Sequence, residues 1–320
     1  MQPTQEGQRA GSADLPSFVD RLDAALERLH TPALVGLDPH LDLLPAPFAV
    51  ARDPRAPRSE RAAAVEAFCR ELIELVADEV AAVKPQSAFF EVLGADGALA
   101  WERVVAHARA CGLLVIGDVK RSDIASTAAA YATAFLEGLP GLGREHLCDA
   151  ITLSPYLGSD SLVPFLEACE RTGAGLFVLV RTSNEGSGEF QEHGRPRLCE
   201  RVADALDALG RRLVGRCGLS SLGAVVGATQ PAELAGLRAR MPRSILLLPG
   251  YGAQGASARD VRAAFTDRVR PWRGALVNSS RGVAFAWREK RHAGRSWQDA
   301  TRVALQSMKS ELQEALSTPG

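Results

Sequence analysis

The feature that most constrains the fold of this chain is an alternation of short apolar runs with amphipathic helical patterns. The runs are mostly apolar without alternation, which is typical of strands buried on both faces of a parallel sheet. Between them, apolar residues recur at helical spacing, as in the stripe of Ala64, Phe68 and Leu72. The eight runs are Ala33–Leu37, Ala81–Lys84, Leu113–Val119, Ala150–Leu153, Leu176–Val180, Leu222–Val226, Ser244–Leu248 and Ala275–Asn278.

Eight β/α units over about 250 residues predict an α/β fold of the TIM-barrel type, (β/α)8. An additional helix is expected to begin near Ser17, with Asp20 as its capping partner. A further helix is expected after Ser296. Thr229 and Ser257 are expected to cap the helices that follow the sixth and seventh runs. The alternative is an open doubly wound sheet, although no G-x-G-x-x-G follows the first run. We expect residues 1–13 to form a flexible tail and residues 14–320 to form a single barrel domain.

Composition excludes several classes of protein. The 320 residues carry a formal net charge of -1, so no global basic field attracts nucleic acid or an anionic membrane surface. No apolar run is long enough to span a bilayer, and the segment 1–15 lacks a secretory signal. The six Cys are scattered and the six His form no ligand pattern, which predicts reduced thiols and no metal site. A cytoplasmic protein is expected.

Lysine is scarce in this chain. Of its 37 basic residues only four are Lys, so Arg occupies most positively charged positions. Because Lys and Arg are not interchangeable, a Lys inside an apolar run calls for a chemical explanation. Lys84 ends the second run, and Lys120 directly follows the third.

Carboxylates and ammonium groups gather at the ends of the first three strands. Asp38 follows strand one, Lys84 ends strand two, and Asp118, Lys120 and Asp123 follow one another at the end of strand three. Residues two apart on a strand point to the same face. Buried charges are tolerated when they are paired, and a nearby carboxylate favours the charged form of an amine. The sequence therefore predicts an alternating array of charges that holds an ammonium group ready to deliver a proton.

The ends of strands seven and eight are typical of a phosphate site. Pro249–Gly255 is rich in glycine, which lets backbone N–H groups approach an anion closely. Gln254 adds side-chain donors, and Arg281 adds a planar guanidinium group that can donate two parallel hydrogen bonds to one anion. TIM barrels often bind phosphate at these two positions. We therefore expect charge chemistry at one end of the site and a phosphomonoester at the other.

Five segments together resemble one known family. Asp118–Thr127 reads D-V-K-R-S-D-I-A-S-T and resembles the D-x-K-x-x-D-I-x-x-T signature of orotidine 5'-phosphate decarboxylases. Val35–Pro39 and Val83–Gln86 look like the ends of that family's first two strands, and Pro249–Gly255 and the Arg281 corner look like its phosphate loops. The pattern is closest to the longer bacterial branch, type 2.

The resemblance implies a role for each charged residue at the first three strand ends. Lys120 would protonate C6 of the pyrimidine after carbon dioxide leaves. Asp118 would lie near the departing carboxylate and help to hold Lys120. Lys84 and Asp38 would contact the ribose hydroxyls, and Lys84 would also belong to the charge array. No cofactor is implied, because preorganised charge would stabilise the carbanion.

The resemblance also implies contacts further from the reacting carbon. Asp123 and Thr127 would reach into the site of the neighbouring subunit, because this family shares its sites across a homodimer. Ser183 would meet the pyrimidine edge, with Asn184 or Thr182 in its place if the strand ends one residue differently.

The family's phosphate contacts complete the expected site. Gln254 and Arg281 would hold the 5'-phosphate beside Pro249 and Gly250. The substrate would be orotidine 5'-monophosphate and the product UMP.

Other functions stay open. A metal-dependent phosphosugar decarboxylase or aldol-type synthase of the same barrel suite would carry a metal-ligating Glu where this chain has Lys84. A Schiff-base aldolase would need a neutral Lys, which neighbouring carboxylates disfavour. A non-catalytic nucleotide-binding barrel would keep Gln254 and Arg281 without needing the charge array.

Structural interpretations also stay open. Asp118, Lys120 and Asp123 can form an ordinary ion pair at a strand-to-helix corner, and Asp123 can simply cap the next helix. Two long connections, Pro39–Ser59 and Ser183–Arg197, are expected at the carboxyl ends of strands. The candidate lid is Ser183–Arg197 or the loop that contains Gln254.

Overall fold

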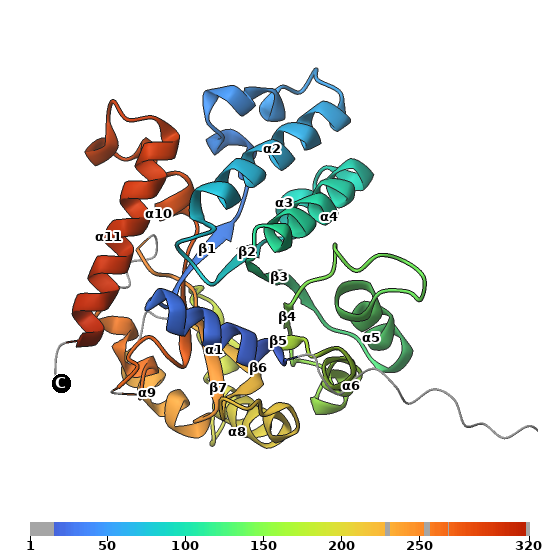
Figure 1. Cartoon of the computed structure of the whole chain (residues 1–320). Coiled ribbons are helices and arrows are strands. Elements are labelled where there is room, and N and C mark those ends of the chain that lie inside the picture. Colours follow the sequence, from blue (N-terminus) through green and yellow to red (C-terminus); the bar gives the residue numbers. More distant parts are fainter. Residues whose placement is uncertain (1–15, 228–230, 253–256, 268, 318–320) are drawn as a thin grey trace, which may run out of the picture.

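The eight predicted strands form a closed parallel barrel. The computed structural model describes residues 16–227, 231–252, 257–267 and 269–317. Neighbouring strands pair in chain order, and β1 pairs with β8 as well as with β2 (Figure 1). This closure confirms the TIM barrel and makes the open doubly wound alternative wrong. The strands are β1 (Ala33–Leu37), β2 (Ala82–Pro85), β3 (Leu114–Arg121), β4 (Ala150–Leu153), β5 (Gly175–Arg181), β6 (Ser220–Val226), β7 (Ser244–Leu248) and β8 (Ala275–Ser279).

Helices surround the barrel and fill its connections. The α-helices are α1 (Phe18–Leu29), α2 (Arg58–Val76), α3 (Ala88–Glu91), α4 (Gly94–Ala110), α5 (Ala125–Ala132), α6 (Val163–Thr172), α7 (Ser187–Gln191), α8 (Leu198–Gly210), α9 (Pro231–Arg240), α10 (Arg281–Ala284) and α11 (Trp297–Ser317). The 3₁₀ turns are η1 (Leu41–Leu43), η2 (Ala46–Arg52), η4 (Ser159–Leu162), η5 (Arg211–Leu213), η6 (Asp260–Ala264), η7 (Ala286–Arg288) and η8 (Lys290–His292), and η3 (Thr133–Glu137) is a π turn.

The expected N-terminal helix closes the amino end of the barrel. Ser17 caps α1 as predicted, because its hydroxyl accepts the N–H of Asp20 at 3.3 Å. The buried face of α1 packs on the interior side chains of the strands, and the ring of Phe18 meets that of Phe177 edge to face with centroids 5.9 Å apart. Figure 1 shows α1 lying across this end of the barrel. Apolar packing therefore covers the amino end of the barrel interior.

The two long connections both leave the carboxyl ends of strands, as expected. The one after β1 folds into η1 and η2, which lie beside α2 (Figure 1). The one after β5 contains α7. Neither is a structureless loop.

Three sequence expectations need comment at the edges of the described residues. The tail at 1–13 and the cap at Thr229 lie outside them. Ser257 does not cap an α-helix. Its N–H and hydroxyl instead donate to Asp260, both at 2.7 Å, and only the short 3₁₀ turn η6 follows. The turn begins at Asp260, and its N-cap residue is Arg259.

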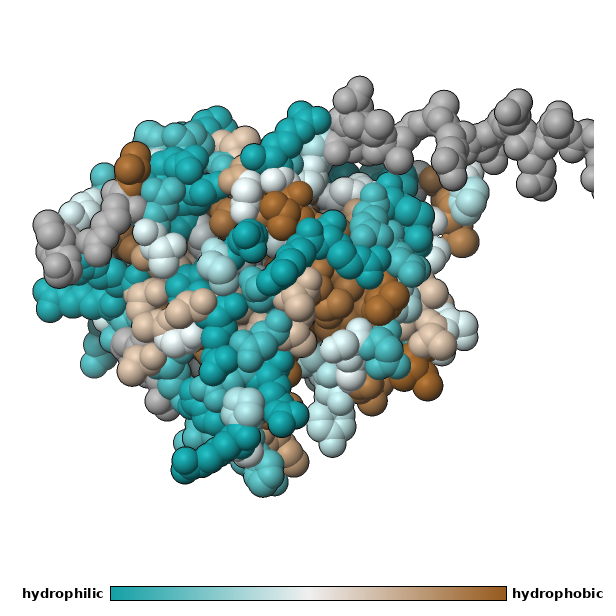
Figure 2. Space-filling view, turned by 90° about the horizontal axis from the view of Figure 1, so that it is seen from below, coloured by the Kyte–Doolittle hydropathy of each residue, from teal (hydrophilic) through white to brown (hydrophobic). Residues whose placement is uncertain are grey.

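The face in Figure 2 is largely hydrophilic, with hydrophobic side chains in separate patches. None of the helices within the described ranges has the length and apolar character needed to cross a membrane.

Candidate active site

A cavity of about 540 Å³ opens at the carboxyl ends of the strands. It brings together most of the predicted site residues, which come from segments distant in sequence. Those that line it are Asp38, Lys84, Asp118, Lys120, Thr182, Ser183, Asn184, Pro249, Gly250 and Arg281.

Four of these residues form a row of alternating charges across the first three strands. The Nζ atom of Lys84 lies 4.0 Å from Oδ1 of Asp38 and 2.7 Å from Oδ2 of Asp118. The other oxygen of Asp118, Oδ1, lies 2.5 Å from Nζ of Lys120. Each inner charge therefore has an opposite charge on both sides, as the sequence predicted.

Burial makes this pairing strong. Lys84 and Asp118 are 5% and 7% exposed, whereas the side chain of Lys120 keeps 45% of its surface accessible. Burial opposes ionisation of Asp118, but Lys84 and Lys120 outweigh it and hold the pKa of Asp118 far below its usual range. Burial likewise opposes charge on Lys84, yet Asp118 and Asp38 raise its pKa. Lys120 is thus the accessible cation at the end of a fixed row.

The backbone bends to aim Lys120 into the cavity. Its φ of 42° lies in the left-handed region, which is uncommon for a residue with a side chain. The N–H of Lys120 donates to the hydroxyl of Thr152 at 2.9 Å, and that hydroxyl donates to Oδ1 of Asp118 at 2.9 Å. Thr152 therefore fixes the bend and the carboxylate together.

Sequence reasoning did not single out Thr152. It is 1% exposed and lies in the fourth apolar run, between Ile151 and Leu153. A hydroxyl in a strand buried on both faces needs a partner, and that was the available signal. The signal did not say which residue across the barrel would be the partner.

The segment after β5 forms a second wall of the cavity. The hydroxyl of Thr182 accepts from the Nε2 of Gln191 at 2.8 Å and donates to Oδ1 of Asn184 at 2.6 Å. The N–H of Thr182 donates to Oε1 of Gln191 at 2.8 Å. Thr182 is therefore occupied within the loop. Ser183 and Asn184 also line the cavity, and the hydroxyl of Ser183 has no hydrogen-bond partner in the described part of the chain. Gln191 also lines the cavity, and sequence reasoning missed it.

Arg181 anchors that wall to the barrel. Its side chain is 8% exposed and donates to Glu233 of α9 at 3.0 Å and to Ser187 and Glu192 in the α7 segment. Arg197, at the far end of the connection, donates to the same Glu233 at 2.5 Å. Both ends of the connection are thus tied to α9 by one carboxylate.

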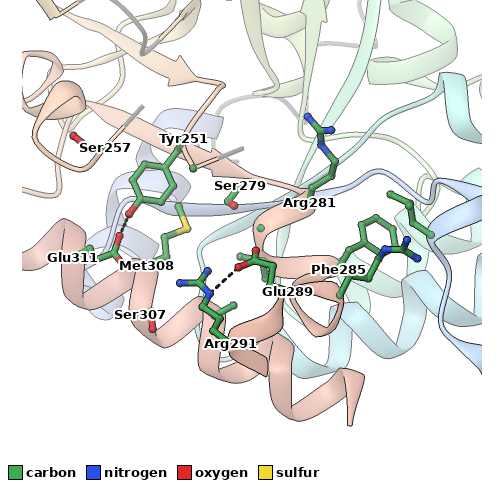
Figure 3. A pocket seen from close by; sticks show the side chains of 16 residues that line it. Tyr251, Ser257, Ser279, Arg281, Phe285, Glu289, Arg291, Ser307, Met308 and Glu311 are labelled. Atoms are coloured by element: carbon green, nitrogen blue, oxygen red, sulfur yellow. Dashed lines mark hydrogen bonds and ion pairs between the residues drawn. The ribbon is translucent and has the colours of Figure 1, made fainter. Parts of the chain in front are cut away.

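The predicted phosphate end lies where β7 and β8 finish. Gly250 and Gly252 have φ of 98° and 72°, in the region that favours glycine. A second cavity, of about 710 Å³, meets the first at Tyr251 and Arg281 (Figure 3). Within the described residues no side chain pairs with the guanidinium of Arg281, which points away from the bonded pair Glu289 and Arg291 in Figure 3. Gln254 lies outside the described residues.

Asp123 and Thr127 do not line the cavity of their own chain. The carboxylate of Asp123 accepts the N–H of Ile124 at 2.8 Å, and Thr127 is exposed on α5. Ile124, not Asp123, is the N-cap residue of α5. Capping therefore does not account for Asp123.

The donor set does not suit a metal ion. Across the ranges that the structure describes, His, Cys, Asp and Glu form no group of three able to hold one. The two carboxylates of the array, Asp38 and Asp118, are separated by the ammonium group of Lys84, which repels a cation.

Comparison with known proteins gives a consistent result. Residues 34–296 match the model of the Orotidine 5'-phosphate decarboxylase / HUMPS family. The chain is 45% identical over 305 residues to the orotidine 5'-phosphate decarboxylase of Rhodopirellula baltica. The matched region covers 92% of this chain and 99% of that protein. It is 36% identical over 286 residues to that of Clostridium perfringens, with 88% and 93% covered.

Solved structures agree with the sequence relatives. The structure of Leishmania donovani OMP decarboxylase superposes with a TM-score of 0.72 at 34% identity, covering 94% of this chain and 100% of that one. A crystal structure of a candidate orotidine 5'-phosphate decarboxylase from Streptomyces avermitilis gives a TM-score of 0.77 at 36% identity, covering 98% and 100%.

Proposed function

The chain belongs to the Orotidine 5'-phosphate decarboxylase / HUMPS family, and from this premise we propose that its charge array removes the carboxylate of orotidine 5'-monophosphate with Lys120 as proton donor. The activity is that of a carboxy-lyase, orotidine 5'-phosphate decarboxylation, in the formation of UMP. The observation that supports the residue roles is the buried row Asp38, Lys84, Asp118 and Lys120.

The reaction breaks the bond between C6 of the pyrimidine and its carboxylate. Carbon dioxide leaves, and the electron pair stays on C6. The ammonium group of Lys120 gives a proton to that carbon and is reprotonated from solvent. Because Asp118 and Thr152 hold Lys120 before substrate arrives, little reorganisation is needed as charge develops. The carboxylate of Asp118 also places a negative charge beside the ammonium group of Lys120, where the substrate carboxylate would lie. When that carboxylate leaves as neutral carbon dioxide, its negative charge is removed from the neighbourhood of Asp118.

The remaining residues of the cavity bind the parts of the substrate that do not react. Lys84 and Asp38 contact the ribose hydroxyls. Ser183 and Asn184 meet the pyrimidine edge, which is supported by the occupation of Thr182 within its own loop.

The phosphate end uses the glycine-rich corner after β7 and the cation after β8. Pro249, Gly250, Gln254 and Arg281 hold the 5'-phosphate. Binding energy from this remote group can be used to order the site around the reacting carbon.

The active form is a homodimer in which each site takes residues from both chains. This proposal is supported by the position of Asp123 and Thr127 outside their own cavity. Ile124, next to Asp123 in the chain, is 57% exposed and is free to enter such a contact.

The test compares wild type, Lys120→Ala and the matched control Lys290→Ala, whose lysine is exposed. We expect Lys120→Ala to lower turnover of orotidine 5'-monophosphate, followed by ultraviolet absorbance, by about 10²- to 10⁴-fold, the range that general acid catalysis contributes. Binding of UMP should stay near normal, and Lys290→Ala should match wild type. Substantial residual turnover would remove Lys120 as the proton donor.

Two additional measurements distinguish the proposed decarboxylase from a metal-dependent enzyme and from a Schiff-base aldolase with the same fold. Turnover that survives excess EDTA excludes a metal-dependent relative. Absence of trapping by borohydride with a keto sugar phosphate excludes a Schiff base, in line with the raised pKa of Lys84, which keeps that amine charged.

A further inference from the structure

Tyr251 occupies the junction between the two cavities. It lines both, it is 7% exposed, and it lies between Gly250 and Gly252, whose φ values are both positive. Glycines restrict the backbone little, so the conformation of this corner depends on what holds the side chain between them.

The partner of Tyr251 is on the C-terminal helix. The hydroxyl of Tyr251 donates to Oε2 of Glu311 on α11 at 2.5 Å, as Figure 3 shows. Burial and the neighbouring Glu311 carboxylate raise the pKa of Tyr251, so the hydroxyl keeps its proton and remains a donor. A hydrogen bond to a charged acceptor is among the stronger kinds.

The same helix also holds the second half of the phosphate end. The hydroxyl of Thr301, which is fully buried in α11, donates to the carbonyl of Val283 at 3.2 Å. Val283 lies in α10, two residues after Arg281. α11 is therefore bonded to both corners that meet at the junction, one at the end of β7 and one after β8.

We propose that Glu311 is a positioning residue for the phosphate-binding end of the active site, acting through the hydroxyl of Tyr251. The contacts of α11 with Tyr251 and with Val283 thereby fix the segments after β7 and β8 relative to each other, so that both can contact one phosphate group. The inference rests on the proposed function, because that function assigns this end of the cavity to the 5'-phosphate. Glu311 itself touches neither the substrate nor the reacting atoms.

The test uses Tyr251→Phe and Glu311→Ala, with Gln313→Ala as the matched control at an exposed position of the same helix. We expect either variant to raise KM for orotidine 5'-monophosphate about 3- to 10-fold, the scale of one net hydrogen bond, with kcat little changed. Glu311→Gln keeps an acceptor oxygen and should restore most of the affinity. The double variant Tyr251→Phe/Glu311→Ala should be no worse than either single variant, because the two act as one unit.

A comparison of UMP with uridine separates positioning from general damage. The variants should weaken binding of UMP and leave binding of uridine unchanged, since uridine lacks the phosphate. Equal loss for both ligands, or no loss for UMP, overturns the proposal. Arg281→Ala distinguishes an error in the phosphate assignment from an error in the role of Glu311. If Arg281→Ala also leaves UMP binding intact, the phosphate assignment is wrong. If only Arg281→Ala weakens binding, the assignment stands and the role of Glu311 is wrong.

Discussion

At the scale of single residues, Asp118 holds the site together. It lies between two ammonium groups and also accepts the hydroxyl of Thr152. Lys84 depends on Asp118 for its close counter-charge, because Asp38 is 4.0 Å away. Removing one member of a buried pair typically costs about 3–5 kcal/mol, chiefly because the other charge is left without a partner.

Asp118 should therefore make stability depend on pH at the acid end. Its pKa is lower in the folded chain, so its contribution is fully present above the unfolded value of about 3.9 and is lost as pH falls through the folded value. We expect the free energy of unfolding in urea to differ between wild type and Asp118→Asn most at neutral pH, with the difference shrinking below about pH 4.

The control for this prediction is Asp78→Asn, which changes an exposed carboxylate on the outer surface. Its difference from wild type should be small at every pH. A difference for Asp118→Asn that is as large at pH 3 as at pH 7 would contradict the pairing. At the alkaline end the sign reverses, because the raised pKa of Lys84 gives a contribution that is lost as pH rises through its folded value.

At the scale of elements, the connection after β1 is a structural bridge. Phe48 of η2 packs edge to face on Phe68 of α2 and on Trp297 of α11, with centroids 5.5 and 5.9 Å apart. Phe68 in turn stacks on Phe285, which follows α10, at 5.6 Å. The proline-rich connection thus ties the C-terminal helix to the barrel, a role that its sequence did not reveal.

This bridge predicts a specific effect of Phe48→Ala. The substitution removes a ring that is 5% exposed and should lower the free energy of unfolding by about 3–5 kcal/mol, because a cavity remains. Amide hydrogen exchange in α11 should speed up more than exchange in the barrel strands. Phe190→Ala is the control, since Phe190 is 59% exposed and should change stability by less than about 0.5 kcal/mol. Unchanged exchange in α11 would show that the bridge does not hold the helix.

At the scale of the whole molecule, closure of the barrel brings the site together. The charged residues arrive from three strands, and β1 also meets β8, which carries Arg281 at its end. The apolar face of α1 covers the other end of the barrel. The proposed second copy would complete the site through Asp123, which its own cavity does not use.

The proposed sharing of sites between two chains predicts complementation between two inactive proteins. Lys120→Ala and Asp123→Ala chains should each be inactive alone, and an equal mixture should recover about a quarter of wild-type activity if subunits of a dimer exchange at random. In that mixture half the dimers carry one intact site. Activity should be followed after exchange has been verified with tagged chains, and no recovery would contradict the sharing. Self-mixing of Lys120→Ala is the control and should recover nothing.

The candidate site was largely predictable because its main residues belong to local patterns. Asp118 and Lys120 lie two apart at the end of a buried run, and Arg281 comes three residues after the end of the last run. Thr152 and Gln191 were missed because their importance depends on partners far away in sequence, and no spacing in the chain records those partners. Thr182 was separated from Ser183 only when the hydrogen bonds of the loop were known.

The sequence alone determined the alternation of strands and helices in the barrel and which strand ends carry the charged residues. It does so because burial on both faces imposes continuous apolar runs, and because a strand directs alternate side chains to one face. Only the tertiary structure decided that Lys84 pairs with Asp118 and that Tyr251 is held from α11. Those contacts join residues 34 and 60 positions apart, and closure of the barrel and packing of its helices bring them within bonding distance.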